Sequence, residues 1–142
     1  MSAPEDALAL IRSSEGLSLK AYLCPAGKWT IGYGHTEGVT SGMVIDAAAA
    51  ETLLAADVAA LARNVDKLVT VTLTPNQRSA LLSFVYNIGV QAFSRSRLLQ
   101  LLNSGDTAAV PAELKRWVYT RGRVLNGLVI RRAREAALWS KA

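Results

Sequence analysis

Three side chains near the N-terminus are of types that could act on a glycosidic bond: Glu15, Cys24 and Thr30. Cleavage of such a bond needs a proton donor for the leaving oxygen, and a group on the opposite sugar face that supplies or holds a nucleophile. Glu15 is the candidate donor, and the Thr30 hydroxyl is a candidate for holding a water molecule. Cys24 stands where a second carboxylate would be expected.

Glu15 lies at the end of a predicted helix. Residues 2–5 (SAPE) favour a helix start, and Gly16 favours its end. Leu8, Ile11 and Glu15 are three and four residues apart and therefore share one helical face. An apolar face and a helix C-terminus both disfavour negative charge, so this placement favours the protonated acid that a proton donor requires. An ordinary surface glutamate at a fraying helix end is the alternative.

The next segment, from about residue 17 to 44, loses the helical period and is predicted to form short β strands. Glycines divide it, and residues 24–28 form the first turn. If residues 29–35 are extended, Thr30, Gly32 and Gly34 share one face. A hydroxyl flanked by bare backbone would let a polymer approach closely. A poorly packed edge strand is the alternative.

The remainder of the chain is predicted to be helical. Asp46 caps a long amphipathic helix, and residues 74–77 (TPNQ) form a capping box before a helix that is apolar nearly all round. Further helices are expected near 96–104, 108–119 and 127–139. The predicted fold class is α+β in one domain of 142 residues. It has a small N-terminal β-hairpin lobe (about 17–45), a connecting helix (about 46–65) and a larger helical lobe (1–16 and 66–142).

The residues around Glu15 resemble a known signature. Phage-type lysozymes of the T-even phage lysozyme family (glycoside hydrolase family 24) carry Glu, eight residues, Asp, five residues, Thr and then Gly-x-Gly-His. Glu15, Cys24 and Thr30 fall at these spacings and are followed by residues 32–35 (GYGH). The resemblance continues through residues 80–89 (ALLSFVYNIG), 93–106 and 127–135 (GLVIRRARE).

The resemblance implies a lysozyme-like fold with a cleft between the two lobes. It also implies an endolysin that hydrolyses the β-1,4 bond between N-acetylmuramic acid and N-acetylglucosamine in bacterial peptidoglycan, so that the host cell lyses. Glu15 would be the general acid, and Thr30 would help to hold the attacking water. The residues expected to border the glycan are Gly34, Thr36, Tyr86 and Asn87.

Cys24 departs from the usual family pattern, which has Asp at this position in most members, although some relatives accept Cys. An ordinary thiol is mostly protonated at neutral pH unless its neighbours favour the thiolate, and Lys20 and Lys28 lie nearby in sequence. A thiolate could act as nucleophile, with retention, or as base to a water, with inversion. The water proposed at Thr30 favours inversion. Alternatively, Cys24 is a small filler in an inactive relative.

Two other functional classes are weighed against this interpretation. A lytic transglycosylase would keep the acid and form an anhydro end without water, and Thr30 argues against it. A basic nucleic-acid-binding helical protein would use the basic stretch at residues 121–134, within a chain of net charge +5. We expect no nucleic-acid partner, although the charge suits an anionic cell-envelope surface. Arg131 or Arg132 is expected either to pair with a carboxylate beside the cleft or to lie on an exposed basic face.

No metal or cofactor is expected, because His35 is the only histidine. His35 is predicted to pack the sheet against the connecting helix, and Trp117 and Trp139 are predicted to be core residues. The N-terminal residues lack an unbroken apolar stretch, so neither a signal peptide nor a membrane anchor is expected. For an endolysin, the resemblance then implies that the protein accumulates in the host cytoplasm and needs a holin to reach the cell wall. A monomer is the default expectation. One cysteine allows no intramolecular disulfide.

Overall fold

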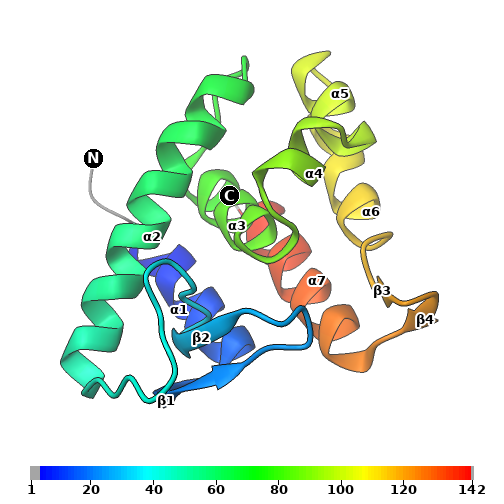
Figure 1. The fold of residues 1–142 in the computed structure, drawn as a ribbon. Coiled ribbons are helices and arrows are strands. Elements are labelled where there is room, and N and C mark those ends of the chain that lie inside the picture. The colour runs from blue at the N-terminus through cyan, green and yellow to red at the C-terminus, as the bar shows by residue number, and fades with distance from the viewer. Residues whose placement is uncertain (1–3, 142) are drawn as a thin grey trace.

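The computed structural model of the chain describes residues 4–141, a mainly helical molecule with two small antiparallel hairpins (Figure 1). Ser2, expected at the first helix start, lies outside the described residues. The elements in chain order are α1 (Glu5–Glu15), β1 (Ser18–Leu23), β2 (Trp29–Gly32), α2 (Ala47–Leu68), α3 (Pro75–Ile88), α4 (Val90–Ser94), α5 (Arg97–Asn103), a 3-10 turn η1 (Thr107–Ala109), α6 (Val110–Leu114), β3 (Tyr119–Thr120), β4 (Arg123–Val124) and α7 (Asn126–Trp139).

Helix α1 carries Glu15 as its last residue, as predicted. Leu8 and Ile11 on the same side of this helix are buried in the core. Gly16 ends the helix with a φ of +72°, a left-handed conformation that favours glycine. Since β1 begins two residues later, Glu15 lies where the helical part of the molecule meets the β hairpin.

Strands β1 and β2 pair antiparallel, with Tyr22 opposite Thr30. The connection is tight, because the Cys24 N–H donates to the Lys28 carbonyl oxygen at 2.9 Å and the Gly27 N–H donates to the Cys24 carbonyl oxygen at 2.8 Å. Gly27 has a φ of +80°, which such a turn requires of one residue. The predicted turn at 24–28 is therefore present, and it brings Cys24 and Thr30 to the same end of the hairpin.

Helix α2 contacts both β2 and α3 and thus joins the hairpin to the helical part. It begins at the predicted cap, where the Asp46 carboxylate accepts a hydrogen bond from the Ala49 N–H at 2.8 Å. His35 Nδ1 lies 2.7 Å from a carboxylate oxygen of Asp57 on α2, and its Nε2 lies 2.8 Å from the Glu37 carbonyl oxygen. This confirms the predicted structural role of His35.

Helix α3 lies at the centre of the helical part, where it packs against α1, α2, α4 and α7 (Figure 1). The predicted capping box is present, with Thr74 and Gln77 bonded reciprocally. All residues from 79 to 85 are buried. The Phe84 ring packs in T-shaped geometry with the rings of Phe93 and Trp117, at centroid distances of 6.5 and 5.6 Å. Trp117 therefore packs against the core, as predicted.

One predicted helix is wrong. Residues 108–119 do not form a single helix, because α6 ends at Leu114 and the chain then enters the β3–β4 hairpin. Arg121 and Gly122 have φ angles of +50° and +77°, the left-handed pair that a two-residue hairpin turn needs. Arginine is an uncommon residue for this conformation, so the sequence carried little signal of the turn. The predicted helices near 96–104 and 127–139 correspond to α5 and α7.

Within residues 4–141, none of the helices combines the length and apolar character needed to cross a membrane.

Candidate active site

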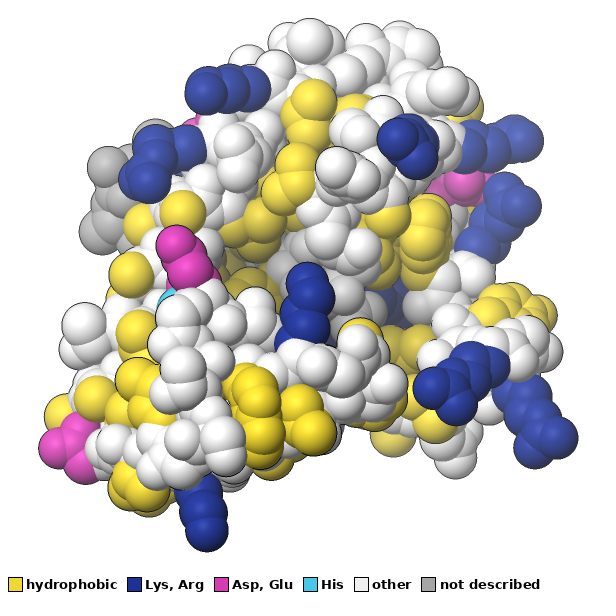
Figure 2. Space-filling view, viewed as in Figure 1, with side chains coloured by type: hydrophobic (Ala, Val, Ile, Leu, Met, Phe, Trp, Pro, Cys, Tyr) yellow, Lys and Arg dark blue, Asp and Glu magenta, His cyan; other side chains and the backbone are white. Residues whose placement is uncertain are grey.

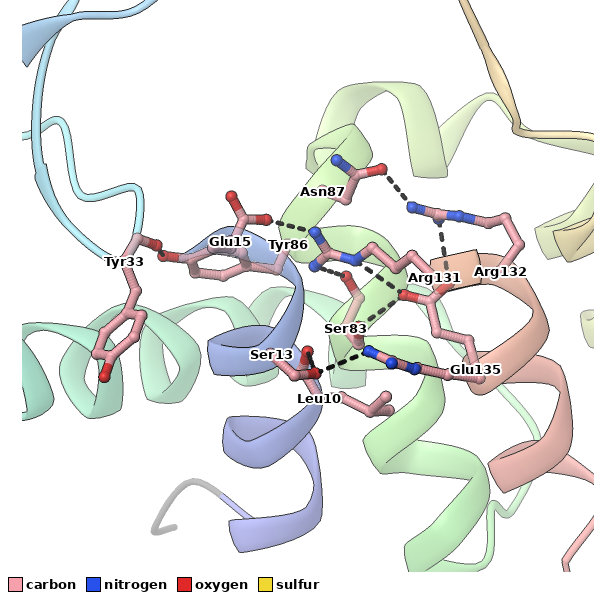
Figure 3. Close-up of polar contacts among 11 residues, drawn as sticks. Leu10, Ser13, Glu15, Tyr33, Ser83, Tyr86, Asn87, Arg131, Arg132 and Glu135 are labelled. Carbon is pink, nitrogen blue, oxygen red and sulfur yellow. Dashed lines mark hydrogen bonds and ion pairs between the residues drawn. The ribbon is translucent and has the colours of Figure 1, made fainter. Parts of the chain in front are cut away.

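Glu15 is partly buried between α3, α7 and the segment after β2 (Figure 3). A Cβ atom added to Gly34 would lie 3.3 Å from Glu15 Oε1 and 3.7 Å from the Tyr86 hydroxyl oxygen. Gly34 also has a φ of +91°, so both its backbone conformation and its close approach to Glu15 favour glycine. Three of the predicted site residues, Glu15, Gly34 and Tyr86, thus lie close together.

The charged partner of Glu15 is Arg131 on α7, whose Nη1 donates to Glu15 Oε2. Arg131 is buried, with 4% of its surface exposed, and its Nη2 donates to the Ser83 carbonyl oxygen at 2.9 Å. Its Nε donates to Glu135 Oε2 at 3.3 Å. Sequence analysis placed Glu15 on an apolar face, and the structure instead gives it a buried cation as neighbour. The expectation that Arg131 or Arg132 pairs with a carboxylate is confirmed, and the exposed alternative is wrong.

Glu135 joins the two arginines beneath Glu15. It is fully buried, accepts a hydrogen bond from the Ser83 hydroxyl at 2.6 Å, and lies 3.2 Å from Arg132 Nη1. Burial raises the pKa of Glu135, against the opposing effect of both guanidinium groups, and lowers the pKa of Arg132 to about 10. The Arg132 guanidinium also lies 4.9 Å from the centre of the Phe84 ring.

Cys24 and Thr30 form a second group at the end of the β1–β2 hairpin. The backbone N–H of Lys28 is the main group that holds the pKa of the Cys24 thiol below its ordinary value, and the backbone N–H of Ala26 adds to it. Donors from the turn thus favour the thiolate, where sequence analysis looked to the side chains of nearby lysines. Cys24 is partly exposed, so this thiol is accessible to solvent.

The open strand face expected at Thr30 is not present. Thr30 is buried, with 4% of its surface exposed, and its hydroxyl donates to the Lys28 carbonyl oxygen at 3.0 Å. A Cβ atom on Gly32 would meet Ala50 and Ile45 at 3.7 Å, so Gly32 packs against the α2 side rather than facing solvent. The prediction assumed that residues 29–35 are extended, with side chains alternating between two faces. Gly32 has a positive φ of +66°, which interrupts the extended strand and therefore this alternation.

A cavity of about 270 Å³ lies beside Glu15, between the segment after β2 and helices α2 and α3. Its lining includes three of the four residues expected to border a glycan, Gly34, Thr36 and Tyr86. The Tyr86 hydroxyl donates to the Tyr33 carbonyl oxygen at 2.6 Å, and burial raises the pKa of Tyr86. The whole lining consists of Gly34, His35, Thr36, Glu37, Asp57, Leu61, Val85, Tyr86 and Gly89.

Asn87, the fourth residue, is exposed, and its Oδ1 accepts a hydrogen bond from Arg132 Nη2. It therefore joins the same polar network through Arg132, which Glu135 links to Arg131 and Glu15 (Figure 3). Among residues 4–141, no group of three or more His, Cys, Asp or Glu side chains is placed to hold a metal ion.

Sequence analysis missed two residues of this network, Ser83 and Glu135. Arg131 and Glu135 are four residues apart on one helix, a spacing that favours an ion pair. The same spacing is common for ion pairs on solvated helix faces. Only the packing of α7 against α3 shows that this ion pair is buried.

Comparison with known proteins gives consistent results. Residues 12–135 match the family described as Phage lysozyme. The chain is 43% identical to an endolysin of Acyrthosiphon pisum secondary endosymbiont phage 1, over the full length of both. It is 47% identical to an endolysin of Bacillus phage PZA, with 99% of this chain and 55% of that one covered. A SAR-endolysin of Escherichia phage Mu is 38% identical, with 89% and 74% covered.

Solved structures agree with these sequence matches. The muramidase domain of SpmX from Asticaccaulis excentricus has a TM-score of 0.90 and 37% identity, with 96% of this chain and 95% of that one covered. A P22 lysozyme mutant has a TM-score of 0.85 and 33% identity, with 99% of each chain covered. The predicted lysozyme-like α+β fold is confirmed.

The environment of Cys24 predicts its reactivity. We expect the pH midpoint for alkylation of this single thiol by iodoacetamide to be lower in the folded protein than in the urea-unfolded chain, because the turn's N–H groups stabilise the thiolate. Replacement of Lys20 or Lys28 by Ala should leave the folded midpoint unchanged, since a side-chain substitution keeps the backbone donor. A folded midpoint at or above the unfolded one would contradict this account.

Proposed function

Because the chain belongs to the phage lysozyme family, we propose that it is an endolysin that hydrolyses bacterial peptidoglycan as a muramidase. Its substrate bond is the β-1,4 linkage between N-acetylmuramic acid and N-acetylglucosamine. The finer classification, as a glycoside hydrolase of family 24 related to the T-even phage enzymes, is part of this proposal. The observation that carries it is a glutamate held by a buried arginine next to Gly34 and Tyr86, two residues that line the adjoining cavity.

In this proposal Glu15 donates a proton to the leaving glycosidic oxygen. It is accessible enough to meet a substrate, with 23% of its side chain exposed, and the contacts to Arg131 and Gly34 limit its orientations. A donor held in place avoids the cost of ordering it during reaction. Gly34, Thr36, Tyr86 and Asn87 border the glycan.

Cys24 and Thr30 act on the opposite side of the sugar. The lowered pKa of Cys24 makes a thiolate available at lower pH than for an ordinary thiol, so this position can carry the negative charge that an aspartate would supply. Such a thiolate can serve as base to a water, giving inversion, or as nucleophile, giving retention. Thr30 helps to hold the attacking water, which favours inversion. No metal or cofactor takes part in this mechanism.

The proposed mechanism depends on how the molecule is divided. We propose a β lobe at about 17–45 and a helical lobe formed by 1–16 and 66–142, with the connecting helix at about 46–65 as hinge. Glu15, from the helical lobe, would then face Cys24 and Thr30 across the cleft. A monomer is sufficient for this arrangement, since every proposed site residue lies on one chain.

The rival classes are less well supported. A lytic transglycosylase would release anhydro-muropeptides, so mass spectrometry of the products separates the two reactions. The nucleic-acid-binding alternative is weakened because Arg131 and Arg132, which belong to the basic stretch at residues 121–134, are buried. The other basic residues between 115 and 134 are exposed: Lys115, Arg116, Arg121, Arg123 and Arg134.

We propose an anionic cell-envelope surface as a further partner of these exposed basic residues. Dark blue side chains gather over the β3–β4 hairpin (Figure 2), beside exposed Tyr119 and Val124. Interleaved cations and apolar side chains suit an anionic lipid surface. Loss of binding to anionic vesicles in an Arg121→Ser/Arg123→Ser variant tests this, and binding equal to that of the unchanged protein would contradict it.

The route to the wall is also a proposal. We propose that the enzyme is made in the host cytoplasm and acts on the cell wall after release. The sequence analysis expected release through a holin, whereas relatives named SAR-endolysins point to a different export route. Lysis by the protein expressed with and without a holin distinguishes the two routes.

We predict that Glu15→Gln abolishes lytic activity, because the amide cannot donate the proton, with a loss of at least about 100-fold. Clearing of a peptidoglycan suspension measures the activity, and circular dichroism checks the fold. Glu5→Gln, at the exposed start of the same helix, is the matched control and should remain active. A lytic Glu15→Gln protein would remove Glu15 from its role.

We also predict that Cys24→Asp stays active, since it restores a negative charge at this position, whereas Cys24→Ala loses most of its activity. The same clearing assay, run from pH 5 to 9, measures both variants. If alanine served as well as cysteine, the position would contribute only packing.

A further inference from the structure

A buried carboxylate competes with Glu15 for the same guanidinium group. Arg131 donates from Nη1 to Glu15 and from Nε to Glu135, the latter at 3.3 Å (Figure 3). Glu135 is fully buried, whereas Glu15 is partly exposed beside the cavity. The proposed reaction has no direct use for Glu135, because a fully buried carboxylate cannot touch the substrate.

We propose that Glu135 is a positioning residue, which offsets part of the charge of Arg131 and thereby keeps Glu15 protonated, as an acid, to higher pH. This inference rests on the proposed role of Glu15 as general acid. Arg131 alone would favour the ionised form of Glu15, which cannot donate a proton. A second carboxylate on the same guanidinium weakens that effect while Arg131 still orients Glu15.

The charges around Glu15 support this inference. The groups that act on it from the helical part are Arg131 and Arg132 from α7 and Tyr86 from α3. The cavity beside it is also lined by Asp57 from α2 and by His35 and Glu37 from the segment after β2, and these groups are the same in every variant compared. With Glu15 protonated and Glu135 ionised, the two arginines leave a net charge of about +1 by counting formal charges. Without the Glu135 charge the net value would be about +2, and loss of the Glu15 proton would be correspondingly easier.

Glu135 is also held in a defined position. The Ser83 hydroxyl donates to its Oε2 at 2.6 Å, and Arg132 Nη1 lies 3.2 Å from its Oε1. Oε1 has this ion-pair contact without a hydrogen bond, so the two hydrogen bonds to Oε2, from the Ser83 hydroxyl and from Arg131 Nε, are what align the carboxylate with Arg131. Burial makes the interaction between Glu135 and Arg131 stronger than the same pair would have in water.

The test is the pH dependence of cleavage by Glu135→Gln. The rate is measured on dilute purified peptidoglycan, well below saturation, so that it reports kcat/KM. We expect the alkaline limb of the profile to move to lower pH by about one unit, with the rate recovering as the pH falls. Glu135→Asp keeps the charge, so its alkaline limb should lie within about half a pH unit of that of the unchanged protein.

A lower rate with an unmoved alkaline limb would show that Glu135 has only a structural role. If Glu135→Gln fails to fold, Arg132→Gln tests the same charge balance from the other side, because Glu135 then keeps Arg131 as its partner. By the same count of formal charges, the charge beside Glu15 falls from about +1 to about zero. The alkaline limb should then move to higher pH, and an unmoved limb would overturn the inference. An active Glu15→Gln protein would instead overturn the proposed function itself, so the two failures are distinguishable.

Discussion

The buried guanidinium of Arg131 is the interaction on which the rest of this site depends. A buried charge is costly unless it is paired and hydrogen-bonded. Arg131 meets that requirement with two carboxylates and a backbone carbonyl from three different helices, α1, α3 and α7. The need to satisfy one cation therefore fixes the end of α1 against α3 and α7. That same need determines where Glu15 stands.

The second half of the site depends on a different constraint, the tight turn of the β1–β2 hairpin. The turn aims backbone N–H groups at the thiol of Cys24, so the fold can favour a thiolate without a cationic side chain. Helix α2 then holds the hairpin in place through the contact between His35 and Asp57. Acid and thiol thus come from separate elements, and each is ordered by contacts that do not involve the other.

The sequence predicted what is local and missed what is distant. Glu15, Cys24 and Thr30 could be found because a helix end and one turn lie within sixteen residues. The contact between Arg131 and Glu15 joins residues 116 positions apart, and no local spacing encodes it. Gly32 shows a different limit, because its positive φ breaks the strand alternation that sequence reasoning assumed. The β3–β4 hairpin was missed since Arg121 adopts a conformation that arginine seldom takes.

The most direct measurement of the central interaction is a double-mutant cycle on Glu15 and Arg131. Unfolding free energies of Glu15→Gln, Arg131→Gln and the double variant are compared with that of the unchanged protein at one pH near neutrality. If Arg131 holds Glu15 as described, the two substitutions couple by about 1 kcal/mol or more, in the sense of a favourable pair. Additive effects, within about 0.4 kcal/mol, would mean that the two side chains do not stabilise one another, and would contradict this account.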